Sequence, residues 1–319
     1  MLNDLSKHIR ALLRCPVCGT QLAIAEACLD CANPACGRRF PVVDGVPILI
    51  NEDNSLFCVE DFTQRRATFF DTRPRSPAAR ALARLTPSLT ANIKGQANYA
   101  RLADMLLTRS DAPKVLVLGG SAQGLGMEPL SERGGIELVD TDVAFGPRTK
   151  IICDAHDIPF AEESFDGVVA QAVLEHVADP YRCVAEIGRV LKKEGLVYAE
   201  TPFMQQMHGA PYDFTRFTIQ GYRRLFAAFE EIDCGVCTGP GMALAWAYKY
   251  FMLTLVNSRA ARKAMEVFAG LTAWHLKYFD RILVSRPFAV YCAAGYHFLG
   301  AKSATVATDR EIAERFAPL

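Results

Sequence analysis

The sequence predicts an α/β fold in which helices cover a mostly parallel sheet, and three observations predict it. From residue 98 onward, short apolar runs typical of buried strands alternate with stretches of helical periodicity, which is the pattern of repeated strand–helix units. One such run, "KVLVL", leads directly into "GGSAQGLG", which holds four glycines in eight positions. Hydrophobic residues make up 50% of the 319 residues and charged residues 22%, a composition that supports a packed core.

The charge balance and the apolar segments narrow the possible function classes. The 35 basic and 35 acidic residues cancel, so the whole molecule has no general attraction to nucleic acid or to an anionic membrane. The N-terminal residues lack the apolar run and the small-residue cleavage site of a secretory leader. The most apolar stretch, residues 241–256, is shorter than the ~20 residues of a membrane span and contains Lys249. We therefore expect a cytoplasmic protein with reduced cysteines and without a transmembrane segment.

The elements of the alternating half are predicted from apolar runs and from their boundary residues. Asp179 stands before a proline, and this pair predicts the start of a helix. Val184, Ile187 and Leu191 would form the buried stripe of that helix, and Gly195 would end it. The predicted strands cover residues 114–120, 136–142, 149–154, 165–171 and 195–203, followed by an antiparallel pair at 229–237 and 288–303. An aromatic-rich helical insertion at about 242–283 separates the members of that pair.

Five of the eleven cysteines fall between residues 15 and 36, and their spacing indicates a metal site. Cys15 and Cys18 form a C-x-x-C pair followed by a glycine, the pattern of a zinc knuckle. The second pair must come from three candidates, of which we favour Cys31 and Cys36, because a glycine again follows Cys36. Cys28 remains the alternative third ligand. Four thiolates suit a closed, structural zinc site.

The cysteine-rich segment also resembles a known family. "LLRCPVCGTQL" and "CGRRFPVVDGVPILI" are similar to the small zinc-ribbon proteins that activate RNA and protein methyltransferases, and to the ribbons fused to bacterial methyltransferases. The resemblance implies a docking or stabilising domain that is too small to be an enzyme. The gap between Cys31 and Cys36 is wider than the C-x-x-C of that family.

An arginine-rich stretch separates this segment from the alternating half. Residues 65–85 contain six arginines, one aspartate and no lysine. Guanidinium groups suit bidentate phosphate contacts, although such a run is also typical of a solvated helix face. The sequence therefore divides into a zinc ribbon at 1–55, an Arg-rich linker and helix at 56–95, a main domain at 96–303 and a tail at 304–319. The six arginines are Arg65, Arg66, Arg73, Arg75, Arg80 and Arg84.

Residues at the strand ends indicate the ligand of the main domain, because open sheets of this kind bind ligands at the carboxyl ends of their strands. The glycine loop fits neither the dinucleotide fingerprint G-x-G-x-x-G nor the phosphate loop G-x-x-x-x-G-K-[ST]. An acid follows about twenty residues later, either Asp140 or Asp142, and could hold a ribose diol. A second acid, Asp154, could accept a hydrogen bond from an adenine amino group. The set suits an adenosine compound that has no phosphate to anchor.

The same residues carry a second resemblance. "CDAHDIPFAEESFDGVVAQAVLEHVADPYRCVAEIGRVLKKEGLVYAETPF" resembles the central block of class I S-adenosylmethionine-dependent methyltransferases, from about residue 114 to residue 203. The resemblance implies a Rossmann-like, seven-stranded methyltransferase sheet that binds S-adenosylmethionine. Val117 stands where the family has an acid, and the glycine loop is longer than the family's G-x-G-x-G. The residues implied to bind the cofactor are Gly119, Ser121, Gly124, Gly126, Asp142, Asp154, Ala155 and Gln171, with Asp140 as the alternative for the ribose.

Polar and aromatic residues after the fifth strand are the candidates for contact with the methyl acceptor. "HGAPYDFTRFT" resembles a segment of bacterial methyltransferases of saccharide or secondary metabolism. His208 is the candidate general base, because the ordinary pKa of histidine lies near neutrality. Asp213 is the candidate to orient it or to hold an acceptor hydroxyl, or it forms a local ion pair with Arg216.

These features predict a methyltransferase that acts on a small molecule or a saccharide, with oxygen as the methylated atom. An RNA methyltransferase of the ribosomal type is the second hypothesis, because those enzymes also join a zinc ribbon to this fold. The zero net charge and the lack of an N-P-P-Y-type motif in "AQAVLEHV" disfavour it. The third hypothesis is a non-catalytic binding or activating protein whose glycine loop no longer binds the cofactor.

Overall fold

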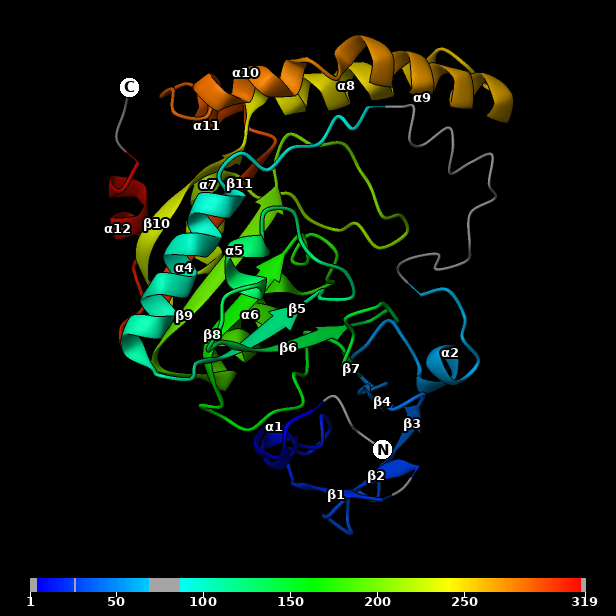
Figure 1. Ribbon diagram of the computed structural model, residues 1–319, viewed down its shortest axis with the longest axis vertical. Coiled ribbons are helices and arrows are strands. Elements are labelled where there is room, and N and C mark those ends of the chain that lie inside the picture. Colours follow the sequence, from blue (N-terminus) through cyan, green and yellow to red (C-terminus); the bar gives the residue numbers. More distant parts are fainter. Residues whose placement is uncertain (1–4, 26, 69–86, 317–319) are drawn as a thin grey trace.

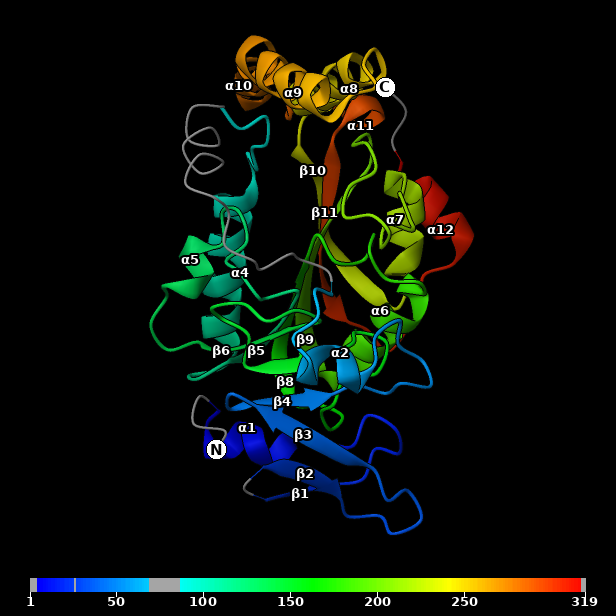
Figure 2. The same ribbon diagram turned by 90° about the vertical axis from the view of Figure 1, so that its right-hand side faces the viewer.

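One continuous mixed sheet organises the chain. The computed structural model describes residues 5–25, 27–68 and 87–316. Within them, eleven strands pair in the order β1-β2-β3-β4-β7-β6-β5-β8-β9-β11-β10 (Figures 1 and 2). The strands are β1 Leu22–Ile24, β2 Cys28–Cys31, β3 Arg39–Val43, β4 Val46–Leu49, β5 Lys114–Leu118, β6 Glu137–Asp142, β7 Ile151–Cys153, β8 Phe165–Gln171, β9 Leu191–Pro202, β10 Phe229–Thr238 and β11 Gly295–Lys302. The helices are α1 Lys7–Leu12, α2 Val59–Thr63, α4 Gly95–Arg109, α5 Glu128–Ser131, α6 Pro180–Val190, α7 Ile219–Leu225, α8 Pro240–Thr254, α9 Arg259–Ala273, α10 Leu276–Leu283, α11 Ala289–Cys292 and α12 Asp309–Glu314.

The seven strands from β7 to β10 form the predicted α/β sheet. β7, β6, β5, β8 and β9 are parallel neighbours, whereas β11 runs antiparallel between β9 and β10. All the predicted strands occur, and the fold class is confirmed. The last strand is shorter than predicted, because α11 occupies the start of the range and β11 begins only at Gly295.

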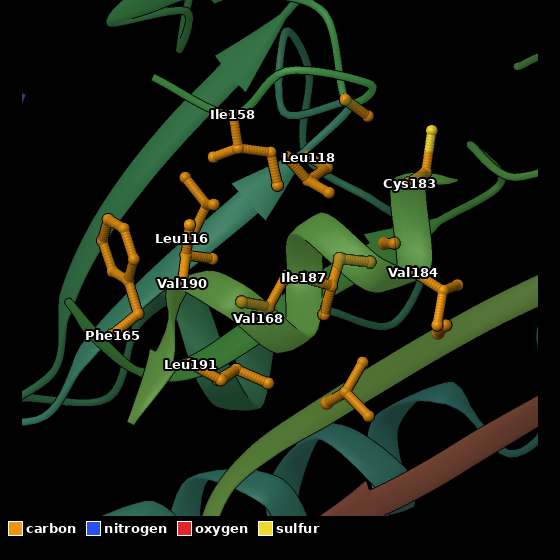
Figure 3. Packing of buried hydrophobic residues seen from close by; sticks show 14 of the residues in the cluster. Leu116, Leu118, Ile158, Phe165, Val168, Cys183, Val184, Ile187, Val190 and Leu191 are labelled. Atoms are coloured by element: carbon orange, nitrogen blue, oxygen red, sulfur yellow. The ribbon is translucent and has the colours of Figure 1, made fainter. Parts of the chain in front are cut away.

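Both faces of the central strands are buried, and alternate residues serve the two faces. Val115 and Val117 of β5 pack against α4, whereas Leu116 and Leu118 pack against α6 on the other side. Figure 3 shows Leu116 and Leu118 of β5 in one packed group with Ile187 of α6. Because successive side chains of a strand point to opposite faces, a near-continuous apolar run is what a doubly covered strand requires.

The helix after Asp179 begins as predicted but ends earlier. The Asp179 side chain accepts a hydrogen bond from the backbone N–H of Arg182, so it caps the first turn. The helix stops at Val190, and Leu191 already pairs with Phe165 as the first residue of β9. The predicted stop at Gly195 is therefore wrong. Sheet pairing of Leu191 removes that residue from the helix, and Gly195 lies inside β9.

The cysteine-rich segment continues the main sheet. Its strands β1 to β4 are antiparallel to one another, and β4 then pairs in parallel with β7 through Ile48 and Ile152. Leu13 also forms a bridge with Phe160, and both side chains belong to one buried cluster with residues of β5 and β8. Figure 2 shows this segment at one end of the molecule. The ribbon and the main domain therefore share a sheet and a core.

The helical insertion lies at the opposite end. Helices α8, α9 and α10 connect β10 to β11 and form a layer across that end of the molecule (Figures 1 and 2). Within the described ranges, none of the helices has the length and apolar character needed to cross a membrane.

Two of the six linker arginines lie in the described part of the chain. Arg65 pairs with Asp44 and lies over the ring of Phe145, and Arg66 pairs with Glu60 at 3.2 Å. Both guanidinium groups therefore contact acids or an aromatic ring of the same region. Arg73, Arg75, Arg80 and Arg84 lie outside the described residues.

Candidate functional site

A cavity of about 190 Å³ opens at the carboxyl ends of β5, β6, β7 and β8. This is the edge at which parallel α/β sheets bind their ligands. Five of the eight residues predicted to bind the cofactor line it, namely Gly119, Asp142, Asp154, Ala155 and Gln171. Further lining residues outside the set predicted to bind the cofactor include Leu56, Phe57, His156 and His176.

The glycines of the loop have different positions: Gly119 lines the cavity, whereas Gly124 and Gly126 pack within the loop and its surroundings. Gly119 lines the cavity with a φ of +69°, and a Cβ there would lie 2.5 Å from the Cγ2 atom of Val173. Glycine is therefore required for both conformation and space. Gly124 and Gly126 lie outside the cavity lining; a Cβ on Gly124 would meet the side-chain oxygen of Gln171. The structure does not bring these two glycines to the cavity.

The two candidate acids of β6 occupy different environments. Asp142 lines the cavity, and its Oδ2 accepts a hydrogen bond of 2.9 Å from the backbone N–H of Ser121. Burial raises the pKa of the Asp142 carboxyl. Asp140 instead forms an ion pair of 3.2 Å with Arg148 and does not line the cavity. Asp142 is thus the acid that can reach a ligand.

Asp154 connects the cavity to the N-terminal segment. Its Oδ2 accepts a hydrogen bond of 2.6 Å from the hydroxyl of Ser55, and its Oδ1 lies 2.6 Å from Nδ1 of His156. Burial disfavours the charged carboxylate, but the hydrogen bonds from His156 and Ser55 lower the pKa of Asp154 below its ordinary value. No sequence pattern indicates the contact between Ser55 and Asp154, because the two residues meet only when the ribbon joins the sheet.

Gln171 holds the glycine loop in place. Its Nε2 donates to the backbone oxygen of Leu125 at 3.0 Å and to Oε2 of Glu200 at 2.7 Å. Asn92 donates to the same Glu200 oxygen at 2.8 Å. Gln171 therefore both lines the cavity and fixes the loop that precedes it.

A cluster missed in the sequence analysis lies where β8 ends. Glu175 is fully buried, and neither of its carboxylate oxygens has a hydrogen-bond partner among the described residues. The Nε2 atoms of His176 and His208 lie 3.6 Å and 3.9 Å from its Oε1. Burial raises the pKa of Glu175 to about 8 and lowers the pKa of both histidines. We call these three residues the Glu175 cluster.

Asp213 contacts His208 through the backbone. Its Oδ2 accepts a hydrogen bond of 2.6 Å from the N–H of His208 but lies 3.9 Å from the ring nitrogen Nδ1. Arg216 donates to the same carboxylate at 2.8 Å, so the predicted local ion pair is present. Burial works against its charge, but the bonds from Arg216 and His208 lower the pKa of Asp213. Asp213 thus positions the His208 segment without a hydrogen bond to the ring.

Helix α8 borders this segment. The ring of Trp246 lies edge-on to the ring of His208, with 5.9 Å between the centroids. The hydroxyl of Tyr250 donates to the backbone oxygen of Met207 at 3.0 Å. Aromatic side chains of the insertion therefore enclose one side of His208.

The four favoured cysteines converge at the N-terminal end. The sulfur atoms of Cys15, Cys18, Cys31 and Cys36 all lie within 4.8 Å of one another. Cys28 lies apart, and its sulfur contacts the carboxylate of Asp30 at 3.8 Å. Gly19 and Gly37, which follow Cys18 and Cys36, have φ values of +71° and +58°. Each C–G pair thus forms the tight turn that its sequence predicted, and the cluster is compatible with a tetrahedral zinc ion.

A family model described as a methyltransferase domain matches residues 119–199. That range begins at Gly119, which lines the cavity, and ends in β9. It contains Asp142 and the neighbouring residues Glu175 and His176. Residues 119–199 therefore match a methyltransferase domain, and the rest of the chain lies outside this match.

One curated relative and several solved structures are similar to the chain. The biotin biosynthesis bifunctional protein BioHC of Cellvibrio japonicus is 29% identical over 154 residues, which span 45% of this chain but only 30% of that protein. A sarcosine dimethylglycine methyltransferase of Galdieria sulphuraria, itself described as putative, is 16% identical, with a TM-score of 0.43 and coverage of 66% of this chain and 86% of its own. The complex of the Haloferax volcanii Trm112 methyltransferase activator with a methyltransferase is 18% identical, with a TM-score of 0.40 and coverage of 72% and 100%. Both structural similarities have TM-scores below 0.5, so no conclusion about this chain is drawn from them.

Proposed function

We propose that the protein transfers a methyl group from S-adenosylmethionine to a hydroxyl oxygen of a small molecule or a saccharide. The observation that supports this most is the single cavity that joins Gly119 and Asp142 to His176 of the Glu175 cluster. The first two residues fit a cofactor without a phosphate, and His176 is the residue of the cluster that lines the same cavity. S-adenosylmethionine, when bound, supplies a methyl group on a positively charged sulfur.

The cavity residues have distinct proposed roles toward that cofactor. Asp142 would accept hydrogen bonds from ribose hydroxyls, since it ends β6 at the cavity wall. Asp154 and the backbone of Ala155 would contact the adenine, and Gly119 allows close approach of the ligand to the backbone. Ser121 acts through its N–H, which holds the Asp142 carboxylate.

His208 is the proposed general base. Burial lowers its pKa, so the imidazole is neutral at physiological pH and can take the proton of an acceptor hydroxyl. The oxygen would then form its bond to the methyl carbon as the bond from carbon to sulfur breaks. Asp213 is a positioning residue, because it fixes the backbone of His208.

The zinc ion is proposed to be structural. The four-cysteine cluster would hold it with Cys15, Cys18, Cys31 and Cys36, and a closed set of thiolates leaves no position for a substrate. The ribbon so fixed delivers Ser55 to Asp154 and Leu56 and Phe57 to the cavity wall.

A matched pair of variants tests the cofactor site. Calorimetric titration of the zinc-loaded protein with S-adenosylmethionine and S-adenosylhomocysteine is expected to show binding that Asp142→Ala weakens about 10- to 100-fold, the effect of losing hydrogen bonds to a charged group. Asp140→Ala, which breaks only the ion pair with Arg148, is expected to stay within about twofold. Absence of binding to the native protein, or an equal loss in both variants, would refute the proposed site.

A further inference from the structure

The Glu175 cluster gathers three ligand atoms of the kind that bind metals. One oxygen of Glu175 and one ring nitrogen each of His176 and His208 lie within 4.8 Å of one another. Glu175 and His176 follow β8, and His208 lies in the segment after β9. Backbone N–H groups of Phe214 and Thr215 donate to the carbonyl of Glu175 at 2.8 Å and 3.2 Å, which joins the two segments.

Backbone carbonyls direct the same nitrogen of both rings toward Glu175. Nδ1 of His176 lies 2.5 Å from the carbonyl oxygen of Tyr212, and Nδ1 of His208 lies 3.2 Å from that of Gln206. A carbonyl can only accept, so at His176 it favours a proton on Nδ1 and leaves Nε2 as the acceptor nitrogen. Nδ1 of His208 also lies 3.3 Å from Nη2 of Arg216, a donor, so the carbonyl alone does not set the tautomer of that ring. The Nε2 atoms are those that face Oε1 of Glu175. Metal-bound histidines are commonly oriented in this way.

The carboxylate of Glu175 is the second, independent observation. The residue is fully buried, yet both of its oxygens lack a hydrogen-bond partner within the described part of the chain. Burying such a group without partners is costly, so native proteins rarely do it. A cation between Glu175 and the two Nε2 atoms would satisfy the carboxylate.

The charged groups around the cluster are compatible with a cation. Arg216 lies on the far side of the His208 ring, with its Nη2 3.3 Å from Nδ1. Asp213 accepts two hydrogen bonds from that guanidinium and balances its charge. The positive group therefore faces away from Nε2.

We propose that Glu175, His176 and His208 bind a divalent transition-metal ion, at a site separate from the four-cysteine cluster. Two imidazole nitrogens and one carboxylate oxygen suit zinc, iron(II), manganese or cobalt, and three protein ligands leave coordination positions open. His176 also lines the cavity, so the ion would lie at its wall.

Binding of the ion is independent of the proposed function, but a role of the ion in methyl transfer rests on that function. An acceptor hydroxyl on an open coordination position would lose its proton to solvent more readily, since a bound cation lowers the pKa of a coordinated hydroxyl. In the loaded protein His208 is a ligand, and the ion takes over the role proposed for the base.

Cobalt binding tests the site without any cofactor or acceptor present. Protein whose ribbon is loaded with zinc is titrated with Co²⁺ and followed by absorbance and calorimetry. One further equivalent of Co²⁺ is expected, with d–d absorption but without the intense thiolate-to-cobalt charge-transfer band of a cysteine site. Glu175→Gln and His208→Ala are each expected to weaken this binding at least tenfold, whereas His275→Ala, at an exposed histidine, leaves it unchanged.

Three outcomes would overturn the metal site. They are the absence of a further equivalent, a further equivalent that shows thiolate charge transfer, and binding that survives in both His208→Ala and Glu175→Gln. Thermal unfolding of each variant identifies one that fails to fold, and His208 is partly exposed, so its truncation is the safer of the two. Because the readout is metal binding alone, failure here is distinct from failure of S-adenosylmethionine binding.

A different observation concerns the outer surface of the helical insertion. Exposed apolar residues recur at helical spacing along α8 and at its C-cap, at Leu244, Phe251 and Leu255, each 57% to 63% exposed. A second series follows α9 and α10: Leu271, Trp274, Tyr278 and Ile282, which are 38% to 64% exposed. Residues 240–294 contain seven lysines and arginines against two acids, in a chain whose total charge is zero. Apolar stripes with a local excess of positive charge are typical of helices that lie in the headgroup region of a membrane.

We infer that the layer of α8, α9 and α10 binds the surface of an anionic membrane. Sedimentation with vesicles is expected to show binding to phosphatidylglycerol-containing vesicles that falls at least fivefold for pure phosphatidylcholine. Phe251→Ser and Ile282→Ser together are expected to abolish it, whereas Val306→Ser, at an equally exposed apolar residue outside the insertion, has no effect. Equal binding of both lipids, no binding, or a dimer in solution that the double variant dissociates would overturn the inference.

Discussion

The four-cysteine cluster near the N-terminus and the Glu175 cluster beside the cavity both gather ligand atoms within 4.8 Å, but they are assembled from different parts of the chain. The cysteines come from one short segment, in which turns at Gly19 and Gly37 aim the thiols. Glu175 and His208 come from segments that follow different strands, and hydrogen bonds from the N–H groups of Phe214 and Thr215 to the carbonyl of Glu175 join these segments.

This difference predicts that the four-cysteine cluster stabilises the fold and that the Glu175 cluster serves the proposed activity. A ribbon of short strands has little core of its own, so a zinc ion held by its four thiols would contribute directly to folding. Within the described part of the chain, the buried carboxylate of Glu175 has no hydrogen-bond partner, which is a cost that the surrounding core must offset. Loss of the first should therefore affect stability, and loss of the second should affect activity.

The largest expected effect is the loss of the thiol cluster. Cys18→Ser, or removal of zinc by a chelator, is expected to destabilise the protein by more than ~3 kcal/mol, because metal binding and folding of such sites are coupled. S-adenosylmethionine affinity should fall as well, since the ribbon supplies Phe57 to the cavity wall. Thermal unfolding and calorimetry measure the two effects. Cys28→Ser is the matched control, and an equal effect there would show that the chosen ligand set is wrong.

The second-largest expected effect comes from the Glu175 cluster and is a loss of catalytic rate. His208→Ala is expected to lower kcat by about 10²- to 10³-fold through loss of the base or metal ligand. Its free energy of unfolding should change by less than about 1 kcal/mol, as the side chain is partly exposed. Steady-state kinetics and denaturant unfolding make the comparison. A stability loss as large as that of Cys18→Ser would remove the distinction between the two clusters.

Gly119→Ala tests the rigidity of the cavity that the Glu175 cluster adjoins. The positive φ and the 2.5 Å approach to Val173 together predict a loss of about 2–3 kcal/mol in stability and weaker cofactor binding. Gly135→Ala has the same kind of backbone, with a φ of +88°, but its nearest neighbour is Leu107 at 3.5 Å. The control should therefore lose only about 1 kcal/mol. Equal losses of stability in the two variants would mean that the Val173 side chain moves aside, which contradicts a rigid cavity wall.

The smallest effect lies at the junction of the ribbon and the cavity. Asp154 has a lowered pKa, so the stability that it contributes is present above its ordinary pKa and is lost as the pH falls through the folded-state value. Ser55→Ala removes one hydrogen bond, which raises that pKa and moves acid unfolding to a higher pH, with a loss of about 1 kcal/mol near neutrality. Circular dichroism during acid titration measures the shift, and Ser88→Ala, at an exposed serine, should leave it unchanged.

The elements that were predicted correctly depend on local patterns. Alternate burial of Val115 and Leu116 follows from the apolar run itself, and Asp179 caps α6 as its position before a proline predicts. The error at Gly195 arose because Leu191 satisfies both a helical stripe and a strand, and pairing with Phe165 decides between them. The helix and strand preferences of Leu191 and its sequence neighbours contain no information about its pairing with Phe165.

The sequence by itself determined the α/β order of elements, the acid at the end of β6 and the convergence of the four thiols, because each depends on spacing within a short segment. Tertiary structure alone decided that β4 joins β7, that Ser55 reaches Asp154, and that Glu175 is buried against two histidines. The physical reason is the same in each case. Burial, pKa and hydrogen bonding depend on atoms that are distant in the sequence and come together only when the sheet is complete.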